Sequence, residues 1–311
     1  MINKNKKEIF YSVLLMVIPL TILFSTYFIS KEKKDDFAIT KDTEIIEEEV
    51  NVFESLKIEG QAAIVKDINT GEILYAKNPD VSLPLASITK ILTVLTVDKL
   101  SDNNMVNITL EDILTEGNSS LLVGENFNKQ DLIDLTLSVS LNDGAAALAS
   151  NAIGSLNLNG PENIFINEMN KLAQEIGMTR SKFYNETGLD ENEKSAGAYG
   201  SASDIAKLFE YAISTNKDLF KATAESDLTI TSREGFIHNA TNTNKIVDKL
   251  PNLLAGKTGH TDLAGGNLAV VIDPSLNRPV VIVVLGSSVD GRFIDVEKLS
   301  DKTIEYFKNK K

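Results

Sequence analysis

Hydrophobic and polar positions divide the 311-residue chain into a charge-free apolar segment, an acidic stretch and a long mixed region. No charged residue occurs from Ile9 to Ser30, and about 20 apolar residues are enough to span a bilayer. A cleaved signal peptide is the alternative, but the run is long for one and lacks an Ala-x-Ala-like site. Because lysines precede the run, we expect residues 1–8 in the cytoplasm, an uncleaved signal anchor in the cell membrane at 9–30, and an extracytoplasmic remainder.

The stretch from residue 31 to 58 is acidic and weakly patterned. It contains Glu47-Glu48-Glu49 and little apolar periodicity, which is typical of a solvated linker. A short helix over residues 43–56 is the alternative. The folded part is accordingly predicted to occupy residues 59–311.

The mixed region begins and ends with strand patterns. Residues 62–68 and 72–76 are rich in aliphatic and β-branched side chains and flank the turn Asn69-Thr70-Gly71, which predicts a hairpin. Runs rich in β-branched residues return at 266–272 and 280–285, separated by a Pro-containing turn. We therefore expect one sheet built from the two ends of the folded region.

Helical spacing of apolar residues dominates the middle of the chain. The predicted helices cover 87–100, 130–139, 143–150, 164–177 and 203–214, and a closing helix is expected over 296–308. Gly154 and Gly177 are predicted to end helices. The fold class is therefore α/β in the α+β sense, with a mainly helical subdomain inserted between the strands.

Composition narrows the classes of function. Hydrophobic residues make up 42% of the chain and charged ones 24%, which is ordinary for a globular protein with a sizeable core. A formal net charge of -13 argues against nucleic acid as a partner, because neutralising phosphates requires clustered Lys and Arg. The lack of cysteine excludes disulfides and thiolate nucleophiles, and two histidines leave little material for a metal centre.

Three Ser-x-x-Lys segments occur, beginning at Ser30, Ser87 and Ser214. Ser30 follows the apolar run and Ser214 ends a predicted helix in a polar stretch. Neither serine therefore lies on a helix that is expected to be buried. Ser87 starts an apolar helix, where the i and i+3 spacing puts Ser87 and Lys90 on one face. A serine nucleophile needs a nearby base, and a lysine whose pKa is lowered by burial supplies one. An N-cap serine beside a surface lysine is the alternative.

Ser-x-Asn segments are also repeated along the chain. Ser101-Asp102-Asn103 lies at the far end of the helix that Ser87 starts, on the order of 20 Å away at 1.5 Å per residue. Those at Ser155 and Ser275 lie in predicted loops. Ser140-Leu141-Asn142 separates two apolar helical stretches, which would fix its side chains in an interhelical turn. It is the plausible site element, although a helix cap is the alternative.

Lys257-Thr258-Gly259 occurs once and completes an ordered set of three motifs with Ser87-x-x-Lys90 and Ser140-x-Asn142. On an edge strand, Lys257 and Thr258 would present a cation and a hydroxyl to a carboxylate. Gly259 would let another backbone approach closely. By itself such a segment is usually a turn, but the order of the three motifs favours a serine acyl-transfer site, as in penicillin-binding proteins and serine β-lactamases.

The chain resembles the D-alanyl-D-alanine carboxypeptidases, the low-molecular-mass penicillin-binding proteins of peptidase family S11. The likeness extends from about Gln61 to Phe307. It is carried by Asp67-Ile68-Asn69-Thr70-Gly71, Ala86-Ser87-Ile88-Thr89-Lys90, Glu116-Gly117-Asn118-Ser119-Ser120, Ser140-Leu141-Asn142-Asp143, Phe183-Tyr184-Asn185-Glu186-Thr187-Gly188-Leu189, Ser201-Ala202-Ser203-Asp204-Ile205-Ala206, Thr241-Asn242-Thr243-Asn244 and Lys257-Thr258-Gly259-His260-Thr261 with Ala264-Gly265.

This resemblance implies the β-lactamase/transpeptidase-like fold, an antiparallel sheet flanked by helices, and a peptidoglycan stem peptide ending in D-Ala-D-Ala as substrate. It also implies β-lactams as covalent inhibitors and no cofactor or metal. The resemblance implies Ser87 as the nucleophile and Lys90 as its base. It implies Ser140 as a proton relay, supported by Asn142. The implied substrate-binding residues are Lys257, Thr258, Gly259, His260 through its backbone, and Arg292.

The sequence also departs from the family pattern. Leu141 stands where the family usually has Gly, and Tyr199-Gly200 replaces a common His, which bears on specificity more than on reaction type. A D,D-endopeptidase that cuts cross-links is an alternative that the sequence does not separate from the carboxypeptidase. A class A-like β-lactamase is less favoured, because residues 183–189 follow the carboxypeptidase pattern. A wall-binding pseudoenzyme predicts missing catalytic groups, and all are present.

Overall fold

The computed structural model describes residues 51–117, 120–155 and 163–310. The predicted cytoplasmic N-terminus, the predicted anchor and most of the predicted linker lie outside these ranges. Among the described residues, no helix has both the length and the apolar character needed to cross a bilayer. The compact unit starts at Asn51, and Val52 and Phe53 are buried in its core. Packing therefore begins before the predicted boundary at residue 59.

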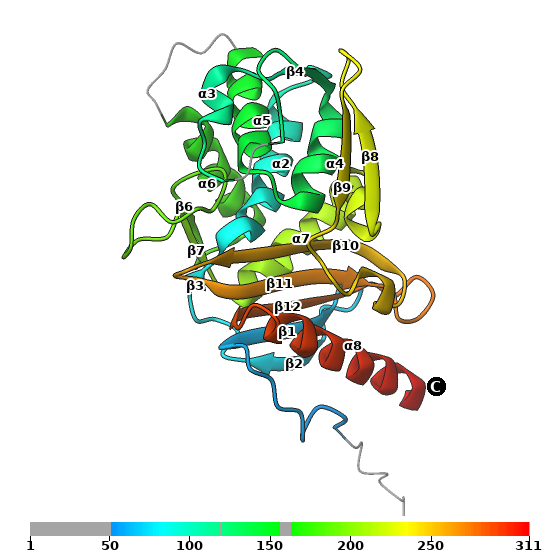
Figure 1. The fold of residues 1–311 in the computed structure, drawn as a ribbon. Helices are drawn as coiled ribbons and strands as arrows, with labels where there is room; N and C mark the ends of the chain where they lie inside the picture. The colour runs from blue at the N-terminus through cyan, green and yellow to red at the C-terminus, as the bar shows by residue number, and fades with distance from the viewer. Residues whose placement is uncertain (1–50, 118–119, 156–162, 311) are drawn as a thin grey trace, which may run out of the picture. The chain divides into compact units, whose positions relative to one another are not determined.

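A five-stranded antiparallel sheet joins the two ends of this unit (Figure 1). Its strand order is β10 (Leu253–Thr261), β11 (Gly265–Ile272), β12 (Val280–Ser287), β1 (Ala62–Asp67) and β2 (Ile73–Lys77). In the register of β1 with β12, Ala62 lies opposite Leu285. The predicted hairpin and the predicted late strands therefore form one sheet, as expected, and β10 is an edge strand.

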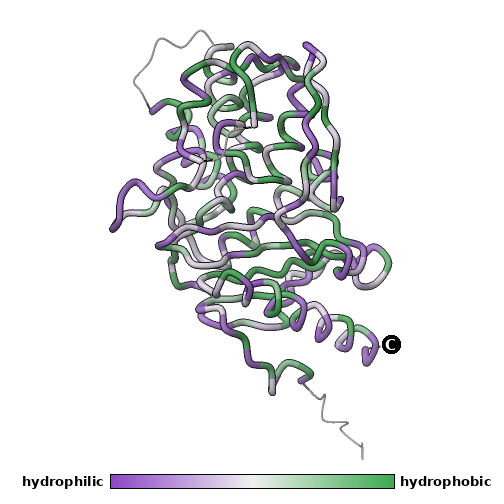
Figure 2. Tube along the Cα trace, in the orientation of Figure 1, coloured by the Kyte–Doolittle hydropathy of each residue, from purple (hydrophilic) through white to green (hydrophobic). Residues whose placement is uncertain are grey.

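Alternate residues of the central strands face two separate cores, as the period of two along a strand requires. Val281 and Val283 of β12 belong to one core, whereas Val280 and Ile282 belong to the other. The first core includes apolar residues of α7 (Ala202–Asn216), and the second includes those of α8 (Gly291–Asn309). Figure 2 shows apolar residues along these strands and mixed hydropathy along α8. The sheet is thus covered on both faces.

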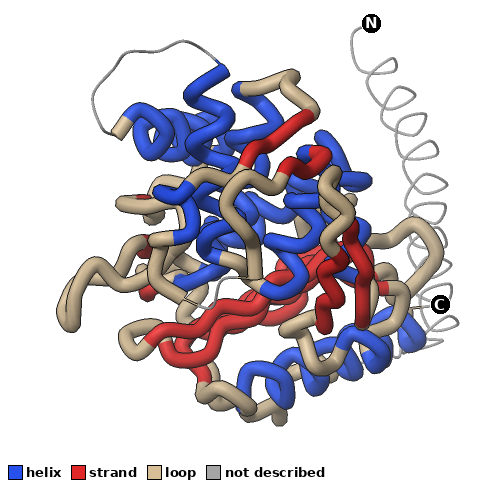
Figure 3. The backbone as a smooth tube through the Cα atoms, turned by 45° about the horizontal axis from the view of Figure 1, so that its top comes forward, coloured by secondary structure: helices blue, strands red, loops and turns tan. Residues whose placement is uncertain are grey.

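A helical lobe lies on the α7 side of the sheet (Figure 3). Its central helix α2 (Thr89–Leu100) has an unbroken run of buried residues from Thr89 to Val97, as expected of a helix with packing partners all round. Around it lie α4 (Lys129–Val139), α5 (Asn142–Ser155) and α6 (Ile164–Ile176). The predicted insertion of helices between the strands is therefore confirmed.

Short elements complete the described chain. The lobe and its connection to the sheet contain β3 (Leu83–Pro84), the 3₁₀ helix η1 (Ala86–Ile88), β4 (Met105–Asn107), α3 (Leu110–Ile113), β5 (Asn126–Asn128), β6 (Lys182–Phe183), β7 (Ala198–Gly200), η2 (Lys217–Ala224), β8 (Asp227–Thr231), β9 (Ile237–Thr241) and η3 (Val247–Lys249). β8 and β9 form an antiparallel hairpin beside α4.

Two helix boundaries differ from the sequence-based expectation. Gly177 ends α6 in a left-handed conformation with φ 84°, as predicted, but Gly154 lies inside α5. α8 begins at Gly291 rather than at Val296, because the Ser288 hydroxyl accepts a hydrogen bond from Gly291 N at 3.0 Å and Phe293 is buried. Arg292 is therefore held in the first turn of a packed helix.

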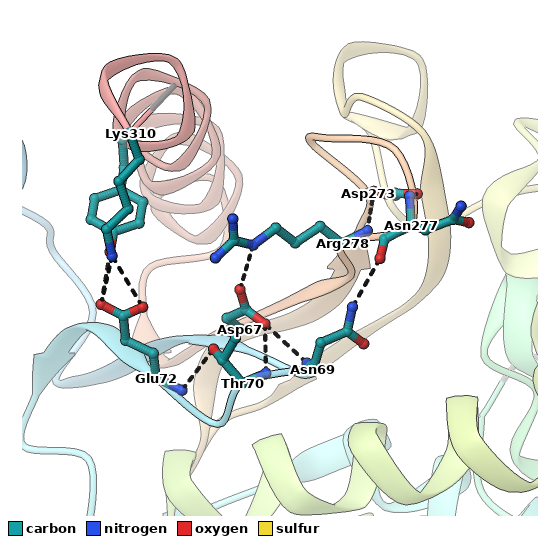
Figure 4. Close-up of polar contacts among 9 residues, drawn as sticks. Asp67, Asn69, Thr70, Glu72, Asp273, Asn277, Arg278 and Lys310 are labelled. Carbon is teal, nitrogen blue, oxygen red and sulfur yellow. Dashed lines mark hydrogen bonds and ion pairs between the residues drawn. The ribbon is translucent and has the colours of Figure 1, made fainter.

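A polar network closes the end of the sheet where β1 turns into β2 (Figure 4). The buried carboxylate of Asp67 accepts hydrogen bonds from the backbone of Asn69 and Thr70 and from Arg278 Nε at 2.8 Å. Burial raises the pKa of Asp67, but the hydrogen bond from Arg278 and its positive charge leave the pKa below its usual value. The Arg278 guanidinium also lies 4.4 Å from the centre of the Phe307 ring, so the network links the hairpin turn to α8.

Candidate active site

Ser87 and Lys90 lie on one face of the first helical turn, as their spacing predicts. Ser87 belongs to η1, and Lys90 lies in the first turn of α2, which follows directly. Lys90 Nζ is 2.9 Å from Ser87 Oγ. The Lys90 side chain is 0% exposed, whereas Ser87 is only partly buried. A hydroxyl within reach of solvent thus lies against a fully buried amine.

The surroundings of Lys90 bring its pKa into the neutral range. Its Nζ also contacts Asn142 Oδ1 at 2.7 Å and the Thr187 carbonyl at 2.8 Å, so that three acceptors surround the amine. Burial lowers the pKa of Lys90 to about 7, although the negative charges of Glu186 and Asp143 oppose this shift. A substantial fraction of Lys90 is therefore uncharged at neutral pH and can accept a proton.

The backbone before Ser87 is strained and tightly enclosed. Ala86 has φ 49°, a left-handed conformation that costs an L-residue on the order of 1 kcal/mol. Gly188 and Gly259 pack against this turn, and an added Cβ would lie 1.9 Å from Ala86 O and 2.8 Å from Leu85 O, respectively. These glycines let the loop before Leu189 and the strand β10 close on the backbone that presents Ser87.

The second motif occupies the interhelical turn that the sequence predicts. Ser140 caps the C-terminus of α4 with φ 66°, and Asn142 is the first residue of α5. Besides its contact with Lys90, Asn142 donates a hydrogen bond from Nδ2 to Glu116 O at 2.8 Å. Leu141 between them is 6% exposed, so its bulk points into the protein. The turn therefore links the second motif to the Ser87–Lys90 pair.

Lys257 of the edge strand β10 contacts the second motif. Its Nζ lies 2.9 Å from Ser140 Oγ and 2.9 Å from the Thr258 carbonyl, and its side chain is 1% exposed. Burial lowers the pKa of Lys257 well below its usual value, and the positive charges of Lys90 and Arg292 lower it further. All three predicted motifs thus lie together: Lys90 contacts Ser87 and Asn142, and Lys257 contacts Ser140, two residues before Asn142 in the same turn.

Thr258 has a partner that was not among the predicted site residues. Its Oγ1 is 2.7 Å from the Oγ1 of Thr243, and Thr243 donates a hydrogen bond from its backbone N to Ser138 O at 2.9 Å. Thr243 therefore connects β10 to the end of α4. Its membership of the family-like run Thr241-Asn242-Thr243-Asn244 was the signal that could have identified it.

Arg292 lies behind β10 and is not a solvated surface residue. It is 7% exposed and donates a hydrogen bond from Nη1 to Gly259 O at 2.7 Å. Its Nε is buried without a protein partner, and burial lowers its pKa. The side chain of His260, by contrast, is exposed, which is compatible with a role for its backbone only. Among the described residues, no cluster of three or more His, Asp or Glu side chains could hold a metal ion.

The fold and the motif geometry together define a serine acyl-transfer protein of the penicillin-binding class. The model of the D-alanyl-D-alanine carboxypeptidase family, peptidase family S11, matches residues 48–289, and the chain therefore belongs to this family. This finding confirms the resemblance that the sequence motifs indicated.

Individual relatives agree with this assignment. A D-alanyl-D-alanine endopeptidase of Pseudomonas aeruginosa is 32% identical over 72% of this chain and 70% of its own length. The D-alanyl-D-alanine carboxypeptidase DacF of Bacillus subtilis is 29% identical over 78% of this chain, but the match spans only 61% of DacF. Penicillin-binding protein D2 of Listeria monocytogenes, solved with ampicillin bound, is 27% identical with a TM-score of 0.64, covering 79% of this chain and 98% of that one.

Proposed function

We propose that the protein is a serine-type D-alanyl-D-alanine carboxypeptidase, which removes the terminal D-Ala from peptidoglycan stem peptides through an acyl-enzyme at Ser87. The observation that carries this proposal is the 2.9 Å contact of Ser87 Oγ with a buried lysine whose pKa is lowered to about 7. Nucleophile and base are both side chains, so the reaction needs no cofactor.

Acylation begins with the neutral form of Lys90. Its Nζ takes the proton of Ser87 while Oγ attacks the carbonyl of the penultimate D-Ala. The backbone N–H groups of Ser87 and His260 are the proposed oxyanion donors, and such a donor contributes about 3 kcal/mol in other serine hydrolases. The C–N bond then breaks as Ser140 relays the proton taken up by Lys90 to the leaving amine of D-Ala, so that Lys90 and Ser140 end the step in their starting protonation states. Water later hydrolyses the ester and restores the Ser87 hydroxyl.

The terminal carboxylate of the substrate is the proposed ligand of Lys257 and Thr258, with Arg292 behind them. Two arguments support this role. The pKa of Lys257 is lowered because burial and two neighbouring cations disfavour its charge, so an anion brought beside it would be stabilised. Arg292 donates Nη1 to Gly259 O and is 7% exposed, so its positive charge lies beside this strand rather than in solvent.

β-Lactams are the expected covalent inhibitors, since the same Ser87 Oγ can open their amide. The loop before Leu189 supports slow hydrolysis of the resulting ester over β-lactamase turnover, because its Glu186 and Thr187 carbonyls accept hydrogen bonds from Thr93 Oγ1 at 2.6 Å and Lys90 Nζ at 2.8 Å. These two hydrogen bonds tie the backbone of the loop to side chains of α2. Rapid penicillin turnover would favour the β-lactamase alternative.

The cellular location is part of the same proposal. The apolar run at residues 9–30 supports an uncleaved anchor in the cell membrane with the catalytic domain outside. The full-length protein should stay in the membrane pellet after an alkaline wash. A mature N-terminus found after residue 30 by protein sequencing would contradict the anchor without affecting the enzymatic assignment.

The enzymatic proposal is tested by release of D-Ala from diacetyl-L-Lys-D-Ala-D-Ala. Replacement of Ser87 by Ala should lower kcat by about 10⁴-fold or more, as loss of a serine nucleophile does elsewhere. Ser214→Ala is the matched control, because Ser214 heads another Ser-x-x-Lys segment and is exposed. Equal activity of Ser87→Ala and wild type would refute the nucleophile.

A further inference from the structure

A groove of about 580 Å³ lies beside the strand β9 and has no part in the mechanism above. Every residue of β9 lines it, together with Phe236, whereas none of the described residues of β8 does. Because successive residues of a strand point to opposite faces, a groove lined by all of them runs along the edge of the strand. β9 lies between β8 and α4 (Figure 1), and the remaining lining comes from α4 and neighbouring segments: Ser120, Leu122, Leu135, Val139 and Leu141. These residues together form the β9 groove.

The hydrogen bonds of the hairpin show which residues of β9 bond to β8. At the tip, Ser232 N donates to Phe236 O at 2.9 Å. Hydrogen-bonded and non-hydrogen-bonded pairs alternate along an antiparallel ladder. Counted from this pair in the observed register, His238 and Ala240 exchange hydrogen bonds with β8. The bond that Asn242 N donates at 2.8 Å to the residue just before β8 fits the same alternation.

The other residues of β9 turn their backbone groups away from β8. These residues are Ile237, Asn239 and Thr241, and within the described part of the chain no hydrogen bond involves their N–H or C=O groups. β9 also contains no Lys or Pro, the residues that commonly protect an exposed sheet edge. β9 therefore presents a row of unpaired donors and acceptors along the groove, an arrangement that accepts an added strand.

The size and lining of the groove suit a short extended chain. Its volume falls within the range of roughly 300–1,000 Å³ typical of ligand sites. None of the described residues that line it is Lys, Arg, Asp or Glu. Phe236 and Ile237 add apolar surface and are 49% and 65% exposed. The occupant should therefore pair through its backbone and place apolar side chains at alternate positions against α4.

The charges around the groove favour a foreign, basic occupant over a second copy of this chain. Residues 120–128 and 225–241, which include the loop and the hairpin beside the groove, carry four acidic residues and one basic residue: Glu125, Glu225, Asp227, Glu234 and Arg233. The whole chain has a formal net charge of -13. Two such copies repel each other, whereas a basic segment is attracted to this surface.

We propose that the β9 groove binds an extended, basic segment of another protein, which adds to the β8–β9 hairpin as a third strand. Main-chain hydrogen bonds to Ile237, Asn239 and Thr241 hold the segment, and its alternate apolar side chains contact Leu135 and Val139. None of the described residues that line the groove is a proposed catalytic or substrate-binding residue. The docked segment therefore leaves the active site accessible, and the inference does not depend on the reaction at Ser87.

The test measures binding of a fluorescent peptide, Lys-Val-Thr-Val-Thr-Val-Lys with blocked ends, to the full-length protein in detergent. Fluorescence anisotropy should show saturable binding. Methylating every second peptide nitrogen blocks one edge of the peptide, and two such peptides block opposite edges. One should bind about 10-fold more weakly than the other, because only one edge pairs with β9. This comparison uses wild-type protein and needs no variant that could fail to fold.

A matched pair of proline variants tests which edge of the hairpin binds. Asn239→Pro removes an N–H that faces the groove, keeps the ladder to β8, and should weaken binding of the unmethylated peptide about 10-fold. Thr229 lies directly opposite Asn239, and its N–H faces the outer edge of β8. Both substitutions remove the hydrogen bond that Thr229 Oγ1 donates to Asn239 Oδ1 at 2.9 Å. Thr229→Pro should nevertheless change binding less than about 2-fold.

The outcomes separate this inference from its alternatives. Absence of saturable binding to wild type would overturn it, as would equal binding of the two methylated peptides or equal losses in the two proline variants. Dimerisation that Asn239→Pro abolishes, without peptide binding, would assign the groove to a second copy instead. A saturating peptide that blocks penicillin labelling would place it in the substrate cleft and overturn the inference. Failure of penicillin labelling alone, with peptide binding intact, would refute only the proposed function.

Discussion

The two buried lysines of the site, Lys90 and Lys257, differ in the charges that surround them. Each lies 2.9 Å from a serine hydroxyl, and neither is more than 1% exposed. Glu186 and Asp143 oppose the effect of burial at Lys90, and its pKa is about 7. At Lys257 the neighbouring charges are Lys90 and Arg292, which lower its pKa further. The same residue type thus has negative neighbours at one position and positive neighbours at the other, which supports the base proposed at Lys90 and the anion site proposed at Lys257.

Of the changes that test this difference between the two lysines, replacement of Lys90 should have the largest effect on the reaction rate. Lys90→Ala leaves Ser87 without the base at 2.9 Å, so acylation by penicillin should slow by about 10³-fold, within the range for general-base catalysis. Stopped-flow or gel-based labelling measures the rate. A loss below about 10-fold would mean that another group deprotonates Ser87.

Lys257→Ala should act on binding more than on the chemical step. Loss of a charged hydrogen-bond partner of the substrate carboxylate should raise KM for diacetyl-L-Lys-D-Ala-D-Ala by about 10- to 100-fold. An analogue whose terminal carboxylate is replaced by an amide supplies the control, because it should be affected far less. Equal losses on both peptides would assign Lys257 to the proton relay alone.

The pH dependence of the acylation rate should follow the pKa of Lys90. The base is active when neutral, so the rate should rise about tenfold per pH unit below 7 and level off above it. A lysine with an ordinary pKa near 10.5 would instead give a rate that still climbs at pH 9. The profile is measured with penicillin over the range in which the fold, followed by circular dichroism, is unchanged.

Thr243→Val should have the smallest effect. It removes the hydroxyl contacts with Thr258 Oγ1 at 2.7 Å and Ser138 O at 3.1 Å but keeps the size of the side chain. Only the contact with Thr258 bears on the proposed carboxylate site, and one lost neutral hydrogen bond corresponds to about a 5-fold reduction in kcat/KM for the carboxylate substrate. Thr229→Val on β8, an exposed hydroxyl outside the site, is the control. An unchanged kcat/KM in Thr243→Val would show that Thr258 is positioned by β10 alone.

The candidate site could be predicted from the sequence because its proposed catalytic groups are side chains in short motifs. Helix periodicity distinguished Ser87, Lys90 and Ser140 from look-alike segments. Lys257 could be selected because Lys-Thr-Gly occurs once and completes the ordered set of motifs. The structure brings these side chains together by short contacts. The sheet could be predicted in the same way, because apolar runs dominate β11 and β12. What was missed depends on tertiary contacts rather than on local patterns.

Several parts of the site depend on backbone groups or backbone conformation, which the identity of the residue does not reveal. Lys90 contacts the carbonyl of Thr187, and Asn142 bonds to that of Glu116, which any amino acid would supply. The left-handed backbone of Ala86 has no glycine to mark it, because the packing around it imposes that conformation.

Peptide mapping of the penicillin adduct by mass spectrometry tests the central claim most directly. The full-length protein is labelled, digested and searched for the peptide that carries the added mass. We predict a single modified residue, Ser87, and no adduct in Ser87→Ala. An adduct on Ser140, Ser214 or any other residue would contradict the account, since the base at 2.9 Å from Ser87 would then serve no nucleophile.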